Sequence, residues 1–495
     1  MLEIFALRKY LTIRLTFLIA ILLFFTNLSF GGNGDNLNNT SDSVGNFQVA
    51  EWKSDRKSAF SFSFDDSFIS QFENIRPILN QFGFRGTFYV LPLFLTEELP
   101  GIWRYGTWPM FEAMALEGHE IGSHSMTHPH LPELETGDTL TEGTISYELY
   151  WSRQLIRQRI TTQACITFAY PYAEHNEIVD SIASLYYESA RGVTGEPNPP
   201  SITGMQWYSL NAIETIFDEP RNTPEDDLDE LEFIKNLIDS SIIKGDWSIF
   251  LAHESVPYDS LAGLIAAGAW NPLSNQWLQA LCEWVYNRTE NNEIWVAPVG
   301  FVTRYVKERD SYTYNLLMAD EDQIKLNVTD NLDDEIFNYP LTSFITVPAD
   351  WNFVLMLQGD RIDTLTAFNK DSSRVVMAEV IPDGGILSLY KMNITSVEND
   401  GNKIPDEFIL YQNYPNPFNP STNIRYAVSS RQFISIRVYD VLGNEVAALV
   451  NEEKQPGIYE VEFNTSRNNV ISSGVYFYQL RAGNQIITKK MLLVR

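Results

Sequence analysis

The sequence predicts an α/β fold followed by two all-β regions, and three observations support this. Between Phe47 and about Val306, short apolar runs alternate with longer amphipathic stretches. After about Ser311 the pattern changes to short alternating segments separated by Asp, Asn, Pro and Gly, and strand-like alternation returns after about Glu407. Strands that alternate with helices indicate a parallel sheet or an α/β barrel, whereas closely spaced short strands indicate a sandwich.

The first region supplies strands and helices in turn. Apolar runs typical of buried strands lie at 59–64, 86–91, 166–170 and 249–252. Helical periodicity marks 71–82, 110–117, 146–159 and 228–243. In barrels of this kind the active site lies where strands end and loops begin, so polar residues after these strands are candidates for chemistry.

The second and third regions read as β-structure throughout. Segments 323–328, 343–347 and 352–357 predict strands of a small β-sandwich. In the last region Ile434, Ile436 and Val438 share one face of a strand, the turn residues Gly443 and Asn444 follow, and strands resume at 458–463 and 475–480. The expected division is a signal peptide at 1–31, a flexible leader at 32–50, the α/β region at 51–306, the sandwich at 311–394, a linker at 395–406 and the all-β module at 407–495.

The N-terminal segment has the order of a secretory signal. Arg8, Lys9 and Arg14 precede an almost wholly apolar run over 15–25, and small and polar residues follow. A membrane anchor is the alternative, but the apolar run is short for a bilayer span, so no stable span is expected once the signal is removed.

Charge and cysteine content limit the possible partners and the source of stability. The chain has 64 acidic and 35 basic side chains, a formal net charge of −29, which repels nucleic acid and anionic membranes. No nucleic-acid partner is therefore expected. Two cysteines, Cys165 and Cys282, cannot form a disulfide scaffold, and we expect two small buried apolar side chains.

Two adjacent acids follow the strand at 59–64. Asp65 and Asp66 repel each other unless a cation or a proton neutralises the pair, although Asp-Asp-Ser is also ordinary turn chemistry. Four of the six histidines lie within 118–130, and His124 and His128, four apart, can face one side of a helical turn and bind one divalent ion. His119 and His130 are expected to be structural or solvated. His253, at the end of the strand at 249–252, is well placed for a general acid.

Taken in this order, these segments resemble the polysaccharide deacetylase family, which is carbohydrate esterase family 4 with its NodB-homology domain, over 51–306. The family's Thr-Phe-Asp-Asp-Gly motif stands here as Ser63-Phe-Asp-Asp-Ser67. Its His-Ser/Thr-x-x-His motif stands as His124-Ser-Met-Thr-His128, and its Leu-x-His motif as Leu251-Ala-His253. The resemblance implies a distorted (β/α) barrel.

The resemblance also implies a role for each residue. Asp66, His124 and His128 would bind a divalent ion, expected to be Zn²⁺, with Asp65 as base. A site of two histidines and one carboxylate leaves coordination positions open for a water and a substrate oxygen. His253 would protonate the departing amine, and the backbone N–H of Tyr172 would face the developing oxyanion. The expected enzyme is a hydrolase of carbon–nitrogen bonds in linear amides, which releases acetate from N-acetylated polysaccharide.

The chain departs from the family at three points. Ala169-Tyr-Pro-Tyr-Ala173 replaces Arg-Pro-Pro-Tyr-Gly, so the arginine that would orient Asp65 is missing, and Arg191 is either its substitute or a surface residue. The family's Asp-Trp motif, which helps set the state of the acid histidine, is not evident at 206–210. Ser67 replaces a glycine and adds a side chain beside the predicted metal.

These departures leave two alternative functions open. One is an O-acetyl esterase acting on a xylan-like glycan, because an ester needs less help at its leaving group than an amide. The other is a catalytically impaired surface protein that binds glycan.

The last region resembles the C-terminal sorting domain of type IX secretion substrates. The residues that carry the resemblance are Tyr414-Pro-Asn-Pro-Phe-Asn-Pro420, Val438-Tyr-Asp-Val-Leu-Gly443, Gly474-Val-Tyr-Phe-Tyr478 and Lys489-Lys490. The resemblance implies recognition by the type IX machinery, passage through the periplasm and the outer membrane, and a secreted or surface-attached product. A β-module that binds sugar or spaces domains is the alternative.

Overall fold

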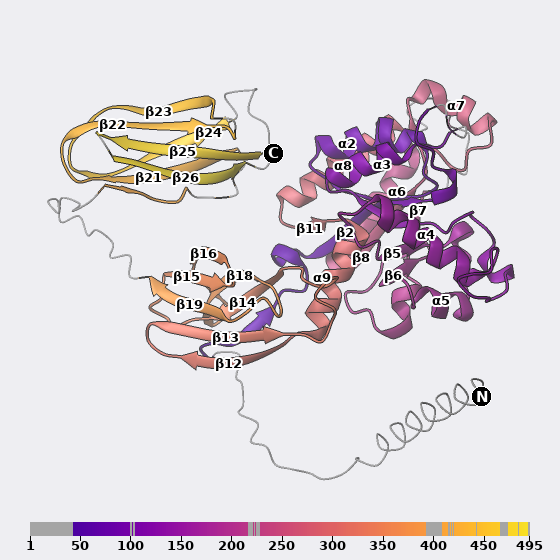
Figure 1. The fold of residues 1–495 in the computed structure, drawn as a ribbon, viewed down its shortest axis with the longest axis horizontal. Helices are drawn as coiled ribbons and strands as arrows, with labels where there is room; N and C mark the ends of the chain where they lie inside the picture. Colours follow the sequence, from indigo (N-terminus) through magenta and orange to yellow (C-terminus); the bar gives the residue numbers. More distant parts are fainter. Residues whose placement is uncertain are drawn as a thin grey trace, which may run out of the picture.

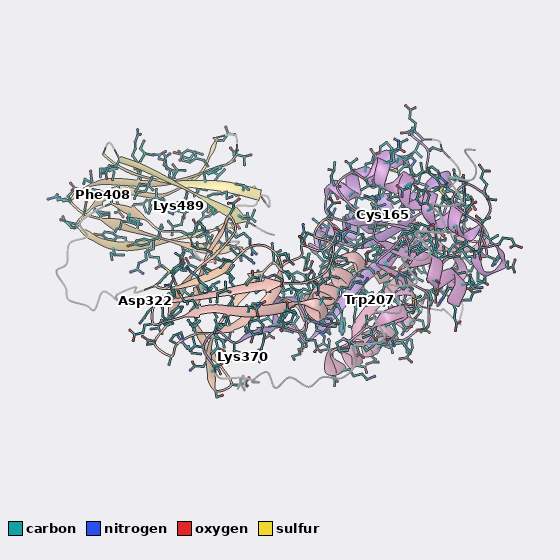
Figure 2. The ribbon with its side chains drawn as sticks, turned by 60° about the horizontal axis from the view of Figure 1, so that its bottom comes forward. Cys165, Trp207, Asp322, Lys370, Phe408 and Lys489 are labelled. Carbon is teal, nitrogen blue, oxygen red and sulfur yellow. The ribbon has the colours of Figure 1, made fainter. Side chains whose placement is uncertain are left out.

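The computed structural model describes residues 43–99, 101, 104–215, 221, 223, 228–392, 408–413, 416, 418, 420–441, 443–465, 474–483 and 485–493. The predicted signal peptide at 1–31 and the linker at 395–406 lie outside the described residues. Across the described ranges, no helix is long and apolar enough to cross a membrane. Figure 1 shows an α/β region, then two all-β regions along the chain. In Figure 2, Cys165 lies in the first region, Asp322 and Lys370 in the second, and Phe408 and Lys489 in the third.

One curled parallel sheet organises the α/β region. Its strand order is β6-β5-β4-β3-β2-β8-β7, and β11 also pairs with β2. The strands are β2 (Ser58–Phe64), β3 (Thr87–Val90), β4 (Glu120–Ser123), β5 (Thr167–Ala169), β6 (Ser189–Arg191), β7 (Ile213–Glu214), β8 (Trp247–Ala252) and β11 (Ile294–Val296). The helices are α2 (Arg76–Gln81), α3 (Trp108–Leu116), α4 (Ile145–Arg159), α5 (Glu177–Ala183), α6 (Asp229–Lys244), α7 (Tyr258–Ala266), α8 (Asn275–Glu290) and α9 (Val299–Ser311). This arrangement confirms the predicted distorted (β/α) barrel.

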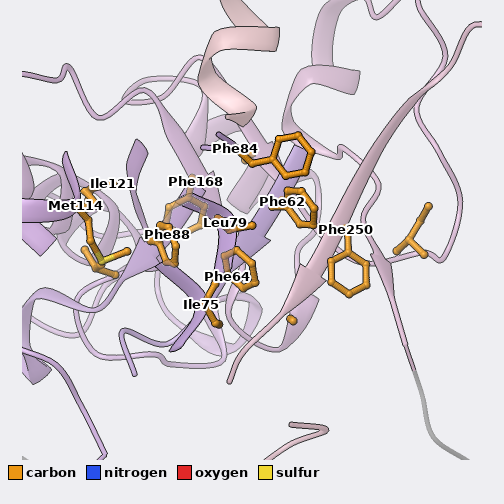
Figure 3. Close-up of a cluster of buried hydrophobic side chains, with 14 of the residues drawn as sticks. Phe62, Phe64, Ile75, Leu79, Phe84, Phe88, Met114, Ile121, Phe168 and Phe250 are labelled. Atoms are coloured by element: carbon orange, nitrogen blue, oxygen red, sulfur yellow. The ribbon is translucent and has the colours of Figure 1, made fainter. Parts of the chain in front are cut away.

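Aromatic side chains fix the central strand in its register. Every residue of β2 is buried, and its Phe60, Phe62 and Phe64 belong to the main hydrophobic core. Figure 3 shows Phe62 and Phe64 among buried side chains that include Phe88 and Phe250 of the neighbouring strands. Burying each ring stabilises the fold by about 1.5–3 kcal/mol, so slippage of β2 would be costly. The residues that follow Phe64 are therefore held firmly at the edge of the sheet.

The helix predicted at 71–82 forms in two parts. A π-helical segment, η2, spans Gln71–Ile75, and α2 continues over Arg76–Gln81. Pro77, at the start of α2, has no N–H to donate to the preceding turn, which is consistent with the change in hydrogen-bond pattern. The two cysteines are buried and free, as expected for small apolar side chains.

Two antiparallel sheets form the predicted sandwich. One has the order β1-β14-β18-β17 and the other β12-β13-β19-β15-β16, and apolar residues of both build one core. The strands are β1 (Phe47–Val49), β12 (Thr313–Ala319), β13 (Gln323–Thr329), β14 (Leu341–Thr346), β15 (Phe353–Gln358), β16 (Arg361–Thr366), β17 (Phe368–Lys370), β18 (Ser373–Val380) and β19 (Leu387–Met392).

The flexible leader predicted at 32–50 is wrong at its C-terminal end. Residues Phe47–Val49 form β1, which pairs with β14 so that Phe47 lies opposite Ile345. Phe47 is buried in the sandwich core, which gives this short segment an apolar anchor. The sandwich thus takes one strand from before the barrel.

The third region is an all-β module of two sheets. Their strand orders are β20-β21-β24 and β23-β22-β25-β26, with a core of its own. The strands are β20 (Ile409–Leu410), β21 (Ser421–Val428), β22 (Gln432–Tyr439), β23 (Glu445–Lys454), β24 (Gly457–Asn464), β25 (Gly474–Ala482) and β26 (Gln485–Leu493). Ile434, Ile436 and Val438 are all fully buried, which confirms the predicted inward face of β22.

Candidate active site

The predicted site residues converge at the carboxyl edge of the parallel sheet. Asp65 and Asp66 follow β2, His124 follows β4, Arg191 ends β6 and His253 follows β8. These strands are neighbours or near neighbours in the sheet, and parallel strands place their carboxyl ends at the same edge. Residues up to 188 positions apart in sequence therefore share one location.

Asp66, His124 and His128 lie together as a set of three ligands. Oδ1 of Asp66 is 3.4 Å from Nε2 of His124 and 3.4 Å from Nε2 of His128. One ligand atom from each of the three residues lies within 4.8 Å of the others. Oδ1 of Asp66 is buried and has no hydrogen-bond partner among the described residues. An orphaned carboxylate oxygen facing two imidazole nitrogens fits a divalent cation.

The second nitrogen of His124 fixes which tautomer faces the site. Nδ1 of His124 lies 2.8 Å from the carbonyl oxygen of Ala169, which can only accept, so Nδ1 carries the hydrogen. Nε2 then presents its lone pair toward Asp66. Burial and the neighbouring His124 lower the pKa of His128 to about 4, so the His128 ring is in the neutral form that binds metals at neutral pH.

The two histidines are held by a loop, so the predicted helical turn at 124–128 is wrong. His128 has a φ of 61°, and its backbone N–H donates to Oγ of Ser125 at 3.0 Å. The buried Glu148 of α4 accepts hydrogen bonds at 2.9 Å from the backbone N–H groups of Met126 and Thr127. It also accepts one at 2.9 Å from the hydroxyl of Thr127. Glu148 thus stabilises the loop although it lies outside the histidine motif. Nothing in the sequence indicates that Glu148 contacts Met126 and Thr127, which lie more than twenty positions earlier.

Arg191 is buried beside Asp65. This rules out the alternative, left open by the sequence, that Arg191 is a surface residue. The Arg191 side chain is 1% exposed, and its guanidinium donates to Oδ1 of Asp65. The same guanidinium lies over the ring of Tyr89, 4.7 Å from the ring centroid. Oδ2 of Asp65 lies on the other side, 3.9 Å from Nε2 of His124. Arg191 therefore binds Oδ1 of Asp65, while Oδ2 faces the three ligands.

His253 has a carboxylate partner that the sequence analysis missed. Nδ1 of His253 lies 3.6 Å from Oε1 of Glu214, which ends β7, the strand beside β8. That oxygen accepts a hydrogen bond of 2.9 Å from Nε1 of Trp270. Burial raises the pKa of Glu214, and the charge of His253 offsets part of that rise. Because β7 has only two residues, no apolar run marks it, and Trp270 stands far from it in the chain.

Tyr172 follows β5 and lines the site with its ring. Tyr172 is 54% exposed, and its ring lies between two imidazoles, 4.4 Å from His128 and 4.1 Å from His130, centroid to centroid. His130 stacks in parallel on it and contacts Glu174, 2.8 Å from Nδ1 to Oε2. His119, in contrast, is buried and accepts the backbone N–H of Gly86 at 3.1 Å, which confirms its structural role.

Ser67 does not crowd the three ligands. It adopts a φ of 61°, the left-handed region in which the family's glycine is favoured. Its Oγ accepts the backbone N–H of Leu91 at 2.7 Å, so the hydroxyl points to the end of β3. That hydrogen bond helps to offset the cost of a non-glycine residue at this turn.

Two family models match the chain. Residues 53–188 match the polysaccharide deacetylase model, and residues 412–494 match the secretion system C-terminal sorting domain. A gellan lyase from Bacillus sp. is 29% identical over 358 residues. The match covers 70% of this chain and 13% of that protein, so the chain spans only a small part of its relative's length.

Solved structures of deacetylases are also similar to part of the chain. They include the Xyl-CE4 domain of a multidomain xylanase from the hindgut metagenome of Trinervitermes trinervoides, with 15% identity and a TM-score of 0.32 over 50% of this chain and 89% of that one. The Streptococcus pyogenes deacetylase PplD in complex with acetate shows 23% identity and a TM-score of 0.27 over 36% and 69% of the two chains. The chain therefore carries a segment, at 53–188, that matches the polysaccharide deacetylase family, and a C-terminal secretion sorting domain that implies export to the cell surface or the surroundings.

Proposed function

We propose that the protein is a metal-dependent hydrolase that removes N-acetyl groups from the amino sugars of a polysaccharide such as chitin or peptidoglycan. The observation that carries this proposal is the buried, unpartnered Oδ1 of Asp66, 3.4 Å from Nε2 of both His124 and His128. Asp66, His124 and His128 would hold the ion, and two imidazoles with one carboxylate suit Zn²⁺. When bound, such an ion supplies a Lewis acid for the acetyl oxygen and makes a water more acidic.

Asp65 is the proposed general base. Its Oδ2 faces the three ligands while Arg191 holds its Oδ1, so the free oxygen is directed to where a water would attack the acetyl carbon. Asp65 would accept a proton from this water as the new carbon–oxygen bond forms. The backbone N–H of Tyr172 would donate to the oxygen on which negative charge develops.

His253 is the proposed general acid, with Glu214 as its positioning residue. An amide nitrogen leaves poorly as an anion, so cleavage of the carbon–nitrogen bond requires a proton at that nitrogen. His253 would give this proton, and Glu214 would stabilise the charged imidazole through Nδ1. The products are acetate and a polysaccharide with a free amine.

An O-acetyl esterase is the second candidate function. The specific observation in its favour is that Nδ1 of His253 is buried and has no hydrogen-bond partner among the described residues, with Glu214 at 3.6 Å. Such a loosely held acid is adequate for an alkoxide leaving group, such as that of an acetylated xylan, but poor for an amine. A protein that only binds glycan is disfavoured, because all three ligands and Asp65 with Arg191 are present.

Acetate release from defined substrates tests the proposal. The full chain is incubated with chitin oligomers, peptidoglycan fragments, acetylated xylan and gellan, the last because a gellan lyase is among its relatives. Each substrate is tested with and without a chelator, and with Asp65→Asn beside the exposed control Asp360→Asn. We expect acetate from an N-acetylated substrate, lost with chelator and in Asp65→Asn but retained in Asp360→Asn. Release from xylan alone would select the esterase, and glycan binding without acetate from any substrate would refute both.

A further inference from the structure

A buried glutamine joins the two strand ends that carry the proposed base and the proposed acid. The pairing of β2 with β8 continues beyond Phe64 by one backbone hydrogen bond, from the N–H of Asp65 to the carbonyl oxygen of Ala252 at 3.1 Å. Beyond that bond, the side-chain amide of Gln71 provides the link. Its Nε2 donates to the carbonyl oxygen of Asp65 and, at 3.0 Å, to the carbonyl oxygen of His253. One amide nitrogen thus contacts the backbone of both residues.

These two contacts require a group that has two hydrogens to donate. A carbonyl oxygen accepts hydrogen bonds and donates none, so the atom between two carbonyl oxygens must be the donor for both. The NH₂ group of Gln71 meets this requirement, and the two contacts also identify which end of its amide is the nitrogen. An apolar side chain at this position would leave both carbonyl oxygens without these donors.

The other end of the same amide is unfavourable for stability. Gln71 is 0% exposed, and its Oε1 is buried with no hydrogen-bond partner among the described residues. Such atoms are rare, because a polar group that loses water without gaining a partner destabilises the fold. An apolar side chain of similar size would avoid this unpartnered oxygen. Because local violations of this kind are expected mainly at functional sites, the Gln71 amide indicates a role in the site.

Side chains on either side of Gln71 hold the same segment in place. Oγ of Ser70 lies 3.4 Å from Oε2 of the buried Glu254, and Nδ2 of Asn74 donates to the carbonyl oxygen of Ser255 at 2.8 Å. Gln71 itself begins η2, a π-helical segment, and such segments recur at functional sites. The segment is therefore fixed to the chain that follows β8 by three side chains, and the Gln71 amide connects it to the base as well.

We propose that Gln71 is a positioning residue that sets the distance between the base Asp65 and the acid His253, an inference that rests on the proposed function. The base must reach the water that attacks the acetyl carbon, and the acid must reach the nitrogen that leaves the same carbon. Both groups must therefore be placed correctly around one carbon atom. An error of about 1 Å in such geometry can lower the rate about 10²-fold. Gln71 acts through the backbone of the two residues rather than through contact with substrate.

Gln71→Met in the full chain tests this role, because methionine is similar in size to glutamine and donates no hydrogen bond. Gln71→Asn, which keeps the amide but shortens the side chain by one methylene, is a second variant in case Gln71→Met does not fold. Gln358→Met is the matched control, since Gln358 is 2% exposed and its Nε2 donates to the carbonyl oxygen of Ile381 at 2.7 Å within the sandwich.

Two substrates separate a misplaced acid from a general defect. Each variant is assayed on an N-acetylated chitin oligomer and on an aryl acetate, whose phenolate leaves without needing a proton from an acid. In both Gln71 variants kcat for the oligomer should fall about 10²-fold with KM nearly unchanged, and the loss on the aryl acetate should be about tenfold smaller. The ratio of the two activities should be unchanged in Gln358→Met. Equal losses on both substrates in the Gln71 variants would overturn the proposal.

Crystal structures of the wild type and of Gln71→Met test the same point without any activity. We expect the carbonyl groups of Asp65 and His253 to move apart by about 1 Å in the variant. Unchanged positions would overturn the proposal. If the wild type releases no acetate from any N-acetylated substrate, the proposed function fails, and the two crystal structures still decide whether Gln71 holds the strand ends together.

Discussion

Replacing Arg191 by methionine removes the buried guanidinium that donates to Oδ1 of Asp65. The guanidinium is 1% exposed and Asp65 is 3% exposed, so water does not replace the lost partner. Removing one member of a buried ion pair costs about 3–5 kcal/mol, because the other charge stays buried and uncompensated. We expect Arg191→Met to lower the free energy of unfolding of the barrel by that amount. The proposed deacetylase activity should fall about 10²–10⁴-fold, the usual contribution of a positioned base.

A double-mutant cycle with Asp65→Asn tests whether the stability lost in Arg191→Met comes from the unpaired charge of Asp65. Urea unfolding of the metal-free chain is followed by tryptophan fluorescence for the wild type, both single variants and the combination. If the lost stability comes from an uncompensated Asp65 charge, the double variant is more stable than Arg191→Met alone. Destabilisations that simply add would refute the reasoning, since they would show that the two side chains do not interact energetically.

Three further outcomes are expected. Glu214→Gln should reduce kcat about 10–100-fold on N-acetylated substrate and shift the alkaline limb of the pH–rate profile. The control Glu196→Gln, which changes an exposed glutamate, should alter neither kcat nor the profile. An unchanged profile in Glu214→Gln would show that Glu214 does not position His253. Dialysis against a chelator should abolish acetate release, and Zn²⁺ should restore it in the wild type but not in His124→Ala; activity that persists without metal would contradict this. Burial lowers the pKa of His119 to about 3 in the folded chain. Below about pH 6.5 the unfolded chain therefore binds a proton at this residue that the folded chain does not. As a result, the free energy of unfolding falls by up to about 1.4 kcal/mol for each pH unit of acidification. Urea unfolding at pH 7 and pH 5 should show a smaller loss for His119→Gln, and equal losses would exclude His119 as the source.

The sequence predicted those parts of the site that are local in the chain. Asp65 and Asp66 follow a strand of alternating phenylalanines, and His124 and His128 lie in one short segment. Pattern and spacing were therefore sufficient to identify these four residues as candidates. The partners of these residues come from other strands. Arg191 reaches Asp65 from β6, and Glu214 reaches His253 from a strand of two residues. Only the order of strands in the sheet brings such pairs together, and spacing along a single sequence does not reveal that order.

Backbone geometry also limited what the sequence could predict about the site. Spacing alone suggested that His124 and His128 share a helical turn, but positive φ angles at Ser125 and His128 place both rings on one side of a loop. Hydrogen bonds from that loop to Glu148 stabilise this conformation. A loop and a helix can present two side chains to the same point, and residue spacing does not distinguish them.

The pairing of β1 with β14 makes the sandwich a discontinuous domain with the barrel inserted between its first strand and the rest. Phe47 and Ile345, its partner, are separated by about 300 residues, so the pairing can form only after the whole barrel has been made. Both ends of the barrel are thereby fixed to one neighbour, which restrains rigid-body rotation between the two. A fragment cut at residue 51 would leave β14 with an open edge and deprive the sandwich core of Phe47. Recombinant fragments that include the sandwich should therefore begin before residue 47.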